Sequence, residues 1–314
     1  MNHVGRAAFP AVLCAGFLLT APASLFAQQK PVGWTTTANL STVATAGNTE
    51  SFSLGGKLRI ERNWLRTVFF VDAGAIRQDA SDKNLFAVGP LVAKDTPCVS
   101  PCSVTDNSVR NTKAENYNVE TGVERRVTER FFYTVNGGYK RDLFSGIETL
   151  ASGRAGVGYY WSDRSAQELK LAVDLTYTHQ KEQVPDPAKK ENFVGGRFEG
   201  DYAVKFGDTK NSSFTTKLAL DENFQVTSDW RLLSDNALTV QMTRRLALQL
   251  GGKIDFRNLP ALQEVQLFAA PPVAGGAGAI GQVTTPFKKT DATITVSLVV
   301  NWGPQGPAGA RPTP

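Results

Sequence analysis

Hydrophobic and polar residues alternate along most of the chain after residue 30, over runs of about ten residues. In the run 246–256, Leu248 and Leu250 fall on one face while Gln249 and Lys253 fall on the other. A period of two is typical of a β-strand with two unlike faces. Runs of this kind predict twelve strands, at residues 33–45, 50–63, 65–78, 114–127, 130–141, 151–162, 166–180, 191–206, 212–224, 230–243, 246–258 and 289–302.

The length of these strands indicates a membrane protein. A tilted strand needs about 9–11 residues to cross a bilayer, whereas strands of soluble proteins average about 5–6 residues. Lipid offers no hydrogen-bond partner to a free sheet edge, so the first strand is expected to pair with the last. We therefore predict an all-β fold, a closed antiparallel up-and-down transmembrane β-barrel of about twelve strands.

The connections between the predicted strands differ in length in a regular way. They are short after even-numbered strands and mostly long after odd-numbered strands, where the predicted loops are 79–113, 142–150, 181–190 and 259–288. The first odd connection, at residues 46–49, is a tight Gly-Asn turn and an exception. Outer-membrane barrels have short periplasmic turns and long outer loops, so this asymmetry favours an outer-membrane location with both termini in the periplasm.

Aromatic residues cluster at both ends of the predicted strands. Rings at the two headgroup levels form the girdles of outer-membrane barrels, although aromatic residues also favour strands in general. One expected girdle comprises Trp34, Trp64, Phe131, Phe132, Tyr159, Trp161, Phe206 and Trp302, and the other comprises Tyr117, Tyr177, Phe193, Phe224, Trp230, Phe256 and Phe287.

The polar faces of the predicted strands would line a lumen if the apolar faces contact lipid. Their charges have both signs, as expected for a water-filled or salt-bridged interior, and they identify no solute. The predicted lumen-facing charged residues are Lys57, Arg59, Glu61, Glu120, Glu124, Arg126, Lys140, Arg154, Lys170, Asp174, Arg197, Glu199, Asp201, Lys205, Lys217, Asp221, Lys253 and Asp255.

The N-terminus has the features of a secretory signal: a basic Arg6, an apolar stretch at 7–20 and small residues after it. We expect cleavage after Ala27, with Ala23 as the alternative. Export through a cleaved signal, together with the predicted barrel, predicts a location in the outer membrane of a Gram-negative-type bacterium. The expected organisation is a signal peptide at 1–27, a short lead at 28–32, the barrel at 33–302 and a Gly/Pro-rich flexible tail at 303–314.

Composition limits the chemistry that the chain could support. Its 314 residues carry a formal net charge of +5, which is too weak a bias to indicate nucleic-acid binding. After signal removal the cysteines are Cys98 and Cys102, and the one histidine is His179, whose parity points it at lipid or the outer rim. Zinc needs about four ligands, so a local disulfide or an incidental pair is favoured over a metal or redox site. We predict no catalytic, cofactor-binding or metal-binding residue.

Two stretches carry a family resemblance, the turn 45–51 and the segment 139–146 followed by 156–159. They resemble a domain-of-unknown-function family whose members are described as salt-induced outer-membrane proteins. The resemblance implies an outer-membrane barrel. The family has no established biochemical activity, and a role in the envelope's response to salt is suggested by its description alone. The loop 79–113 and the tail depart from the family, and Trp302 is the candidate aromatic signal for barrel assembly. The motif residues are Gly47, Asn48, Thr49, Tyr139, Arg141, Asp142, Phe144 and Gly146.

Three classes of function fit this sequence. The first is a non-enzymatic barrel with a polar lumen that acts as a passive channel. The alternatives are an outer-membrane enzyme acting on lipid or peptide, for which His179 is the one candidate base, and a structural or adhesive surface barrel. The expected partners are outer-membrane lipid, the barrel-assembly machinery and a small solute.

Overall fold

The computed structural model describes residues 32–46, 51–88, 98, 102–164, 166–207, 211–243, 245–268 and 280–302. The predicted signal peptide and C-terminal tail lie outside these residues, as does the turn with Gly47, Asn48 and Thr49. Within the described ranges, no helix is long and apolar enough to cross a membrane.

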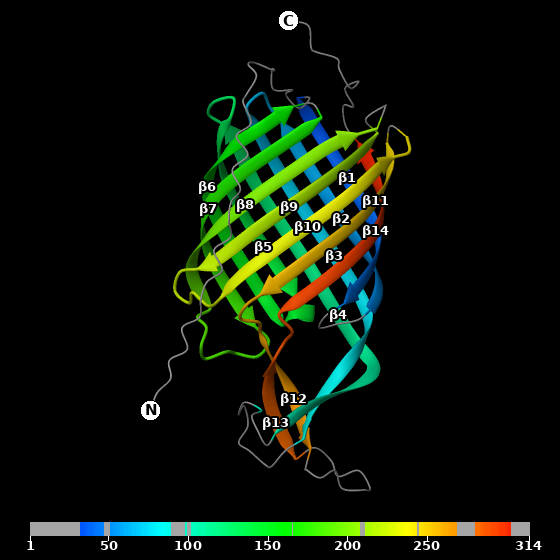
Figure 1. Ribbon diagram of the computed structural model, residues 1–314, viewed down its shortest axis with the longest axis vertical. Coiled ribbons are helices and arrows are strands. Elements are labelled where there is room, and N and C mark those ends of the chain that lie inside the picture. The colour runs from blue at the N-terminus through cyan, green and yellow to red at the C-terminus, as the bar shows by residue number, and fades with distance from the viewer. Residues whose placement is uncertain are drawn as a thin grey trace, which may run out of the picture.

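Twelve strands form a closed antiparallel barrel (Figure 1). Neighbours in sequence pair around the wall from β1 to β11, and β14 pairs with both β11 and β1 to close the ring. The prediction of a closed twelve-stranded barrel is thus confirmed. Its strands are β1 (Gly33–Ala46), β2 (Ser51–Asn63), β3 (Thr67–Val88), β4 (Ser103–Arg126), β5 (Phe131–Asp142), β6 (Ile147–Arg164), β7 (Gln167–Glu182), β8 (Asn192–Phe206), β9 (Ser212–Asn223), β10 (Trp230–Gln241), β11 (Leu246–Arg257) and β14 (Thr290–Trp302).

The wall is inside out compared with a soluble protein. In the middle of β7, Val173 and Leu175 are 58% and 61% exposed, whereas Asp174 between them is 4% exposed. The same alternation occurs in β14, where Val296 and Leu298 are exposed and Ser297 is buried. Apolar side chains that cover the outer surface of a barrel are stable in contact with hydrocarbon. The outer face therefore fits a bilayer core.

The aromatic girdle at the short-turn end needs one correction. This end carries the turns that follow β2, β4, β6, β8 and β10. Trp34 and Trp161 are exposed there as expected, but Phe132 is 2% exposed and packs inside the wall against Tyr160 and Ala172. Phe193, at the opposite, long-loop end, is likewise buried. Both lie on the inward-facing parity of their strands, so these two girdle predictions were wrong.

Two predicted loops at the long-loop end contain strands. β3 and β4 continue pairing out to Val88 and Ser103, with an irregularity at Ala80/Ser81. The segment 259–288 contains β12 (Leu262–Phe268) and β13 (Gly281–Pro286), which pair with each other. β12 also pairs in parallel with the end of β3, at Gln266 and Phe86 among others. The predictions of loops at 79–113 and 259–288 are therefore wrong over the residues that form these strands.

These four segments make a small sheet outside the barrel wall, seen below the barrel in Figure 1. We call it the projecting sheet: β12, β13, and residues 81–88 of β3 with 103–110 of β4. Its core is a cluster of four buried residues: Ala87, Val265, Leu267 and Val283. The run 79–84 is almost wholly polar, so it carries no alternating pattern. A strand needs no lipid-facing side once it has left the membrane, which is why the pattern could not reveal it.

Candidate functional site in the barrel lumen

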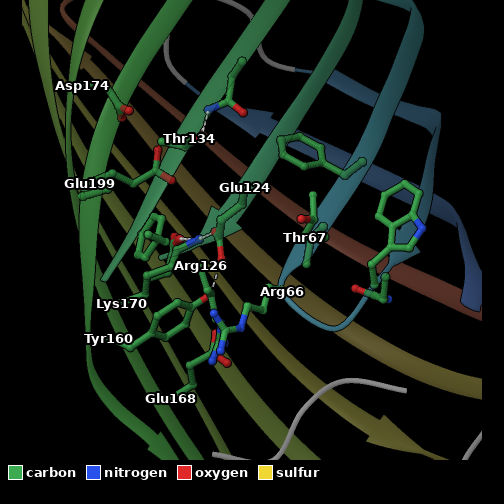
Figure 2. A pocket seen from close by; sticks show the side chains of 18 of the residues that line it. Arg66, Thr67, Glu124, Arg126, Thr134, Tyr160, Glu168, Lys170, Asp174 and Glu199 are labelled. Atoms are coloured by element: carbon green, nitrogen blue, oxygen red, sulfur yellow. Dashed lines mark hydrogen bonds and ion pairs between the residues drawn. The ribbon is translucent and has the colours of Figure 1, made fainter. Parts of the chain in front are cut away.

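A cavity of about 480 Å³ lies inside the barrel toward its short-turn end. Its wall comes from β2 to β9 and from the turns at Trp64–Arg66 and Thr128–Glu129 (Figure 2). Most of the charged residues that were predicted for the lumen and that lie in this half of the barrel line it. Those residues are Arg59, Glu120, Glu124, Arg126, Arg154, Lys170, Asp174, Glu199, Asp201 and Lys217.

Lys170 is at the centre of one ion-pair group in this cavity. Its ammonium lies 3.2 Å from Glu124 and 3.2 Å from Asp201, so it ties β7 to β4 and β8. The Tyr160 hydroxyl donates to the other oxygen of Glu124. Arg126 lies 4.0 Å from the centre of the Tyr160 ring. These contacts hold the charges in fixed positions on the wall.

A second group spans β8 and β9. The guanidinium of Arg197 donates to both oxygens of Asp221, at 3.0 and 2.9 Å, and to Glu199 at 2.9 Å. Lys217 approaches Glu199 at 2.7 Å. Between β2 and β3, Arg59 pairs with Asp72 at 2.6 Å. Basic side chains on this wall are thus held by carboxylates of neighbouring strands.

Asp174 differs from these paired groups. It lines the cavity from the middle of β7, and its buried Oδ1 has no hydrogen-bond partner. Arg197 is its register partner on β8, but that guanidinium is directed to Glu199 and Asp221. On the other side, a methyl group at Gly156 would overlap Asp174 Oδ1 and the Val173 carbonyl oxygen. Glycine at position 156 therefore leaves the room that the Asp174 carboxylate occupies.

The facing wall, made by β10, β11, β14 and β1, is polar but uncharged in its short-turn half. Thr37 donates to the side-chain oxygen of Asn301 at 2.9 Å, and Gln249 donates to Thr239 at 3.0 Å. Asn39 reaches the side-chain oxygen of Gln249 at 3.4 Å. The lumen is therefore two-sided, with hydroxyl and amide groups opposite ionised groups.

The remaining predicted charges lie nearer the long-loop end of the lumen. Lys140 approaches Asp142 at 2.7 Å and Asp255 at 4.0 Å, and Arg257 lies 3.5 Å from Asp255. Lys253 is two residues before Asp255 on the same face of β11. On β2, Lys57 and Glu61 share a face with Arg59, and Glu61 is 2.9 Å from that guanidinium.

The chain matches the family described as "Protein of unknown function, DUF481" over residues 38–266. The chain belongs to this family. No curated protein matches it. Among solved structures it is similar to the NanC porin, with 8% identity, a TM-score of 0.47, and coverage of 84% of this chain and 98% of that one. It is also similar to the KdgM porin in complex with disordered oligogalacturonate, with 6% identity, a TM-score of 0.42, and coverage of 85% and 99%. A third likeness is to the P. putida toluene transporter TodX, with 9% identity, a TM-score of 0.36, and coverage of 87% and 91%.

The motif 139–146 of this DUF481 member lies at the long-loop end, where it holds loops together. Gly146 has φ of 74° at the end of the short 3₁₀ turn Leu143–Ser145, and its carbonyl accepts the Gln183 amide at 2.9 Å. A Cβ at Gly146 would lie 2.7 Å from the Phe287 ring and 2.8 Å from Ala261. Glycine thus permits both the left-handed backbone and the close approach of three loops.

The other described motif residues surround this junction. Asp142 is buried beside Lys140, and the Arg141 guanidinium donates to the Glu148 carbonyl at 3.3 Å. Tyr139 is 45% exposed on the outer face, and Phe144 is half-buried. Their contacts tie loops together and do not reach the cavity lining, so the motif residues described have a structural setting.

Sequence reasoning missed several residues of the lumen site, among them Asp72, Tyr160 and Asp163. Asp72 lines the cavity from a run of β3, 68–75, that is otherwise apolar, and its parity with Phe70 hid it. Tyr160 lies between the predicted girdle residues Tyr159 and Trp161, and no prediction was made for it. Asp163 was assigned to a turn, but β6 continues past an irregularity at Tyr160/Ser162, and Asp163 lies 2.6 Å from Arg126. The isolated acid Asp72 within the apolar run 68–75 is the signal from which a lumenal residue could have been predicted.

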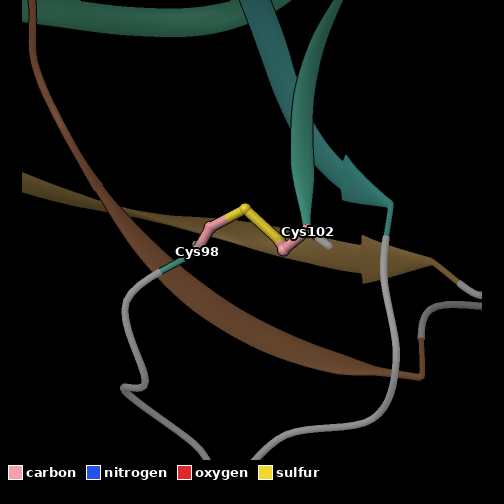
Figure 3. The surroundings of a disulfide bond; sticks show 2 residues. All are labelled: Cys98 and Cys102. Carbon is pink, nitrogen blue, oxygen red and sulfur yellow. A yellow bond between two sulfur atoms is a disulfide. The ribbon is translucent and has the colours of Figure 1, made fainter. Parts of the chain in front are cut away.

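Cys98 and Cys102 are joined by a disulfide (Figure 3), with their Cα atoms 5.3 Å apart. Both pack against the core of the projecting sheet, far from the lumenal charges. The remaining candidate, His179, contacts the Asn192 side-chain oxygen at 2.9 Å, near the end of β7. Trp302 is the last described residue of β14 and is exposed, while its role in assembly remains a prediction.

Proposed function

We propose that this protein is a non-enzymatic channel of the outer membrane, through which small polar solutes diffuse. The observation that carries the proposal is the inverted wall, apolar outside and polar inside, around a cavity of about 480 Å³. An apolar belt supports a position in hydrocarbon, and fixed polar groups in the lumen would lower the cost of a hydrated solute there.

The proposed route to this location is export through the N-terminal signal and insertion by the barrel-assembly machinery, with Trp302 as the recognised aromatic residue. The lipid partners are the acyl chains around the belt. At the headgroup level, Arg62 lies over the rings of Trp34 and Trp64, at 5.3 and 5.5 Å. Such aromatic and basic pairs suit a membrane interface. Fractionation of the envelope tests this placement.

The channel is tested by adding the purified full chain to planar bilayers. We expect discrete conductance steps from protein that shows heat-modifiable gel mobility, the sign of a folded barrel. Folded protein that gives no conductance at any voltage would overturn the proposal.

A pair of cysteine variants makes this test specific to the lumen. Thr134 lines the cavity (Figure 2) and is the register partner of the lumenal Glu124, whereas Val173 faces outward. A charged, membrane-impermeant thiol reagent should reduce the conductance of Thr134→Cys and leave that of Val173→Cys unchanged. Cys98 and Cys102 are bonded to each other and do not compete for the reagent. Equal responses of the two variants would mean that ions do not pass through this cavity.

A further inference from the structure

Acidic groups outnumber basic groups around the cavity. Among the described residues that line it, eight are Asp or Glu and six are Lys or Arg. Low-dielectric walls focus the field of such a charge excess into the space between them. The sign of the excess therefore matters for any ion that enters.

The basic groups in the middle of this wall are already occupied. Arg154 pairs with Glu120, Lys217 pairs with Glu199, and Lys170 lies between two carboxylates. A guanidinium or ammonium held in this way has little capacity left for a mobile anion, because its donors face protein oxygens. The wall offers anions few free partners there.

Asp174 provides the opposite case, an acid without a bonded cation. It is 4% exposed, lines the cavity, and its Oδ1 lacks a hydrogen-bond partner. A buried carboxylate that keeps an unsatisfied oxygen is costly unless a positive charge can approach it. The side chain lies where the cavity reaches the middle of β7 (Figure 2).

We infer that the lumen is selective for small monovalent cations and that Asp174 is the carboxylate that attracts them on their way through. This inference rests on the proposed channel function. A single carboxylate binds such an ion weakly enough to release it, as conduction requires. Among the residues that the structure describes, no group of three His, Cys, Asp or Glu side chains could hold a metal ion. The facing wall adds neutral oxygens, at Thr239 and Asn301 among others.

The test is the reversal potential of the full chain in a planar bilayer that separates two KCl concentrations. We expect K⁺ to be more permeant than Cl⁻. Asp174→Asn keeps the shape of the side chain over Gly156 and removes its charge. It should lower the ratio of K⁺ to Cl⁻ permeability by about tenfold, because one unit charge at roughly 6 Å in water favours K⁺ about threefold and disfavours Cl⁻ about threefold.

Two further variants complete the design. Glu148→Gln removes a carboxylate that pairs with Lys181 at the rim and should leave the ratio unchanged. Lys217→Met removes a cavity cation and should raise the ratio, which keeps the inference testable if Asp174→Asn does not fold. A channel that prefers Cl⁻, or that has no preference, would overturn the cation selectivity but not the channel function. A permeability ratio that is unchanged in Asp174→Asn would do the same. Absence of any conductance overturns the channel itself.

Discussion

The barrel wall and the projecting sheet share two strands, β3 and β4, but their side chains are buried by opposite rules. In the wall, Leu175 is 61% exposed and Asp174 beside it is buried. In the projecting sheet, Leu267 is 1% exposed and packs with Val265 and Val283 in a closed core. The two patterns fit different surroundings, because an apolar outer face suits hydrocarbon while a buried apolar core suits water.

The comparison also separates what holds each region together. The wall owes its order to closed backbone pairing, since lipid leaves no alternative partner for an N–H or C=O group. Among the residues described, the projecting sheet has a core of four buried side chains, with a disulfide against it. Small water-exposed units of this size need such a link. The two regions should therefore respond differently to the same substitution.

The largest expected difference comes from shortening a leucine. Leu267→Ala would leave a cavity in the core of the projecting sheet and lower its local unfolding free energy by about 2–5 kcal/mol. At Leu175→Ala, mobile acyl chains fill the space, so only the transfer free energy of the lost methyl groups is forfeited and the cost is smaller. Hydrogen exchange of the β12 amides measures the first effect, and urea unfolding in lipid vesicles measures the second. Equal costs would contradict the assignment of Leu175 to lipid.

A charged substitution at the same outward-facing position tests the membrane boundaries of the wall. Leu175→Arg places a cation near the middle of the bilayer and should destabilise the barrel by about 2–4 kcal/mol, against about 0–1 kcal/mol for an arginine near an interface. Leu65→Arg, in the exposed turn after β2, is the matched control. Urea titration of both variants in the same vesicles gives the comparison. A cost at Leu65 equal to that at Leu175 would show that the assumed membrane boundaries are wrong.

The sequence predicted the wall well because each spanning strand has two unlike neighbours, lipid and lumen. The alternation in 166–180 and 246–258 records that difference directly, and it also places Lys170 and Asp174 on the inner face. Where a strand has the same solvent on both sides, this signal vanishes. The run 79–84 is almost wholly polar. It is a strand because it pairs with β4, a contact that its local sequence does not indicate.

The contacts inside the lumen were beyond prediction for a different reason. Parity tells which residues face inward, but the partner of each charge depends on the register and stagger between strands. Lys170 could have paired with several acids, and the register brings Glu124 and Asp201 to it. The free oxygen of Asp174 depends in turn on Arg197 being directed elsewhere. Only the assembled wall determines these choices.

Removing the disulfide is expected to have the smallest effect on stability, and that effect should be confined to the projecting sheet. Replacing Cys98 and Cys102 with serine opens a loop whose ends are four residues apart. The chain-entropy cost of so short a loop is about 2 kcal/mol at most. The loss should increase hydrogen exchange in β12 and β13 while heat-modifiable mobility and conductance of the barrel stay unchanged, because the disulfide packs on the projecting sheet. Adding a reductant to the wild-type protein should reproduce the change, and adding it to the double variant should do nothing. If the barrel loses its heat-modifiable mobility as well, the two regions fold as one unit and the contrast between them fails.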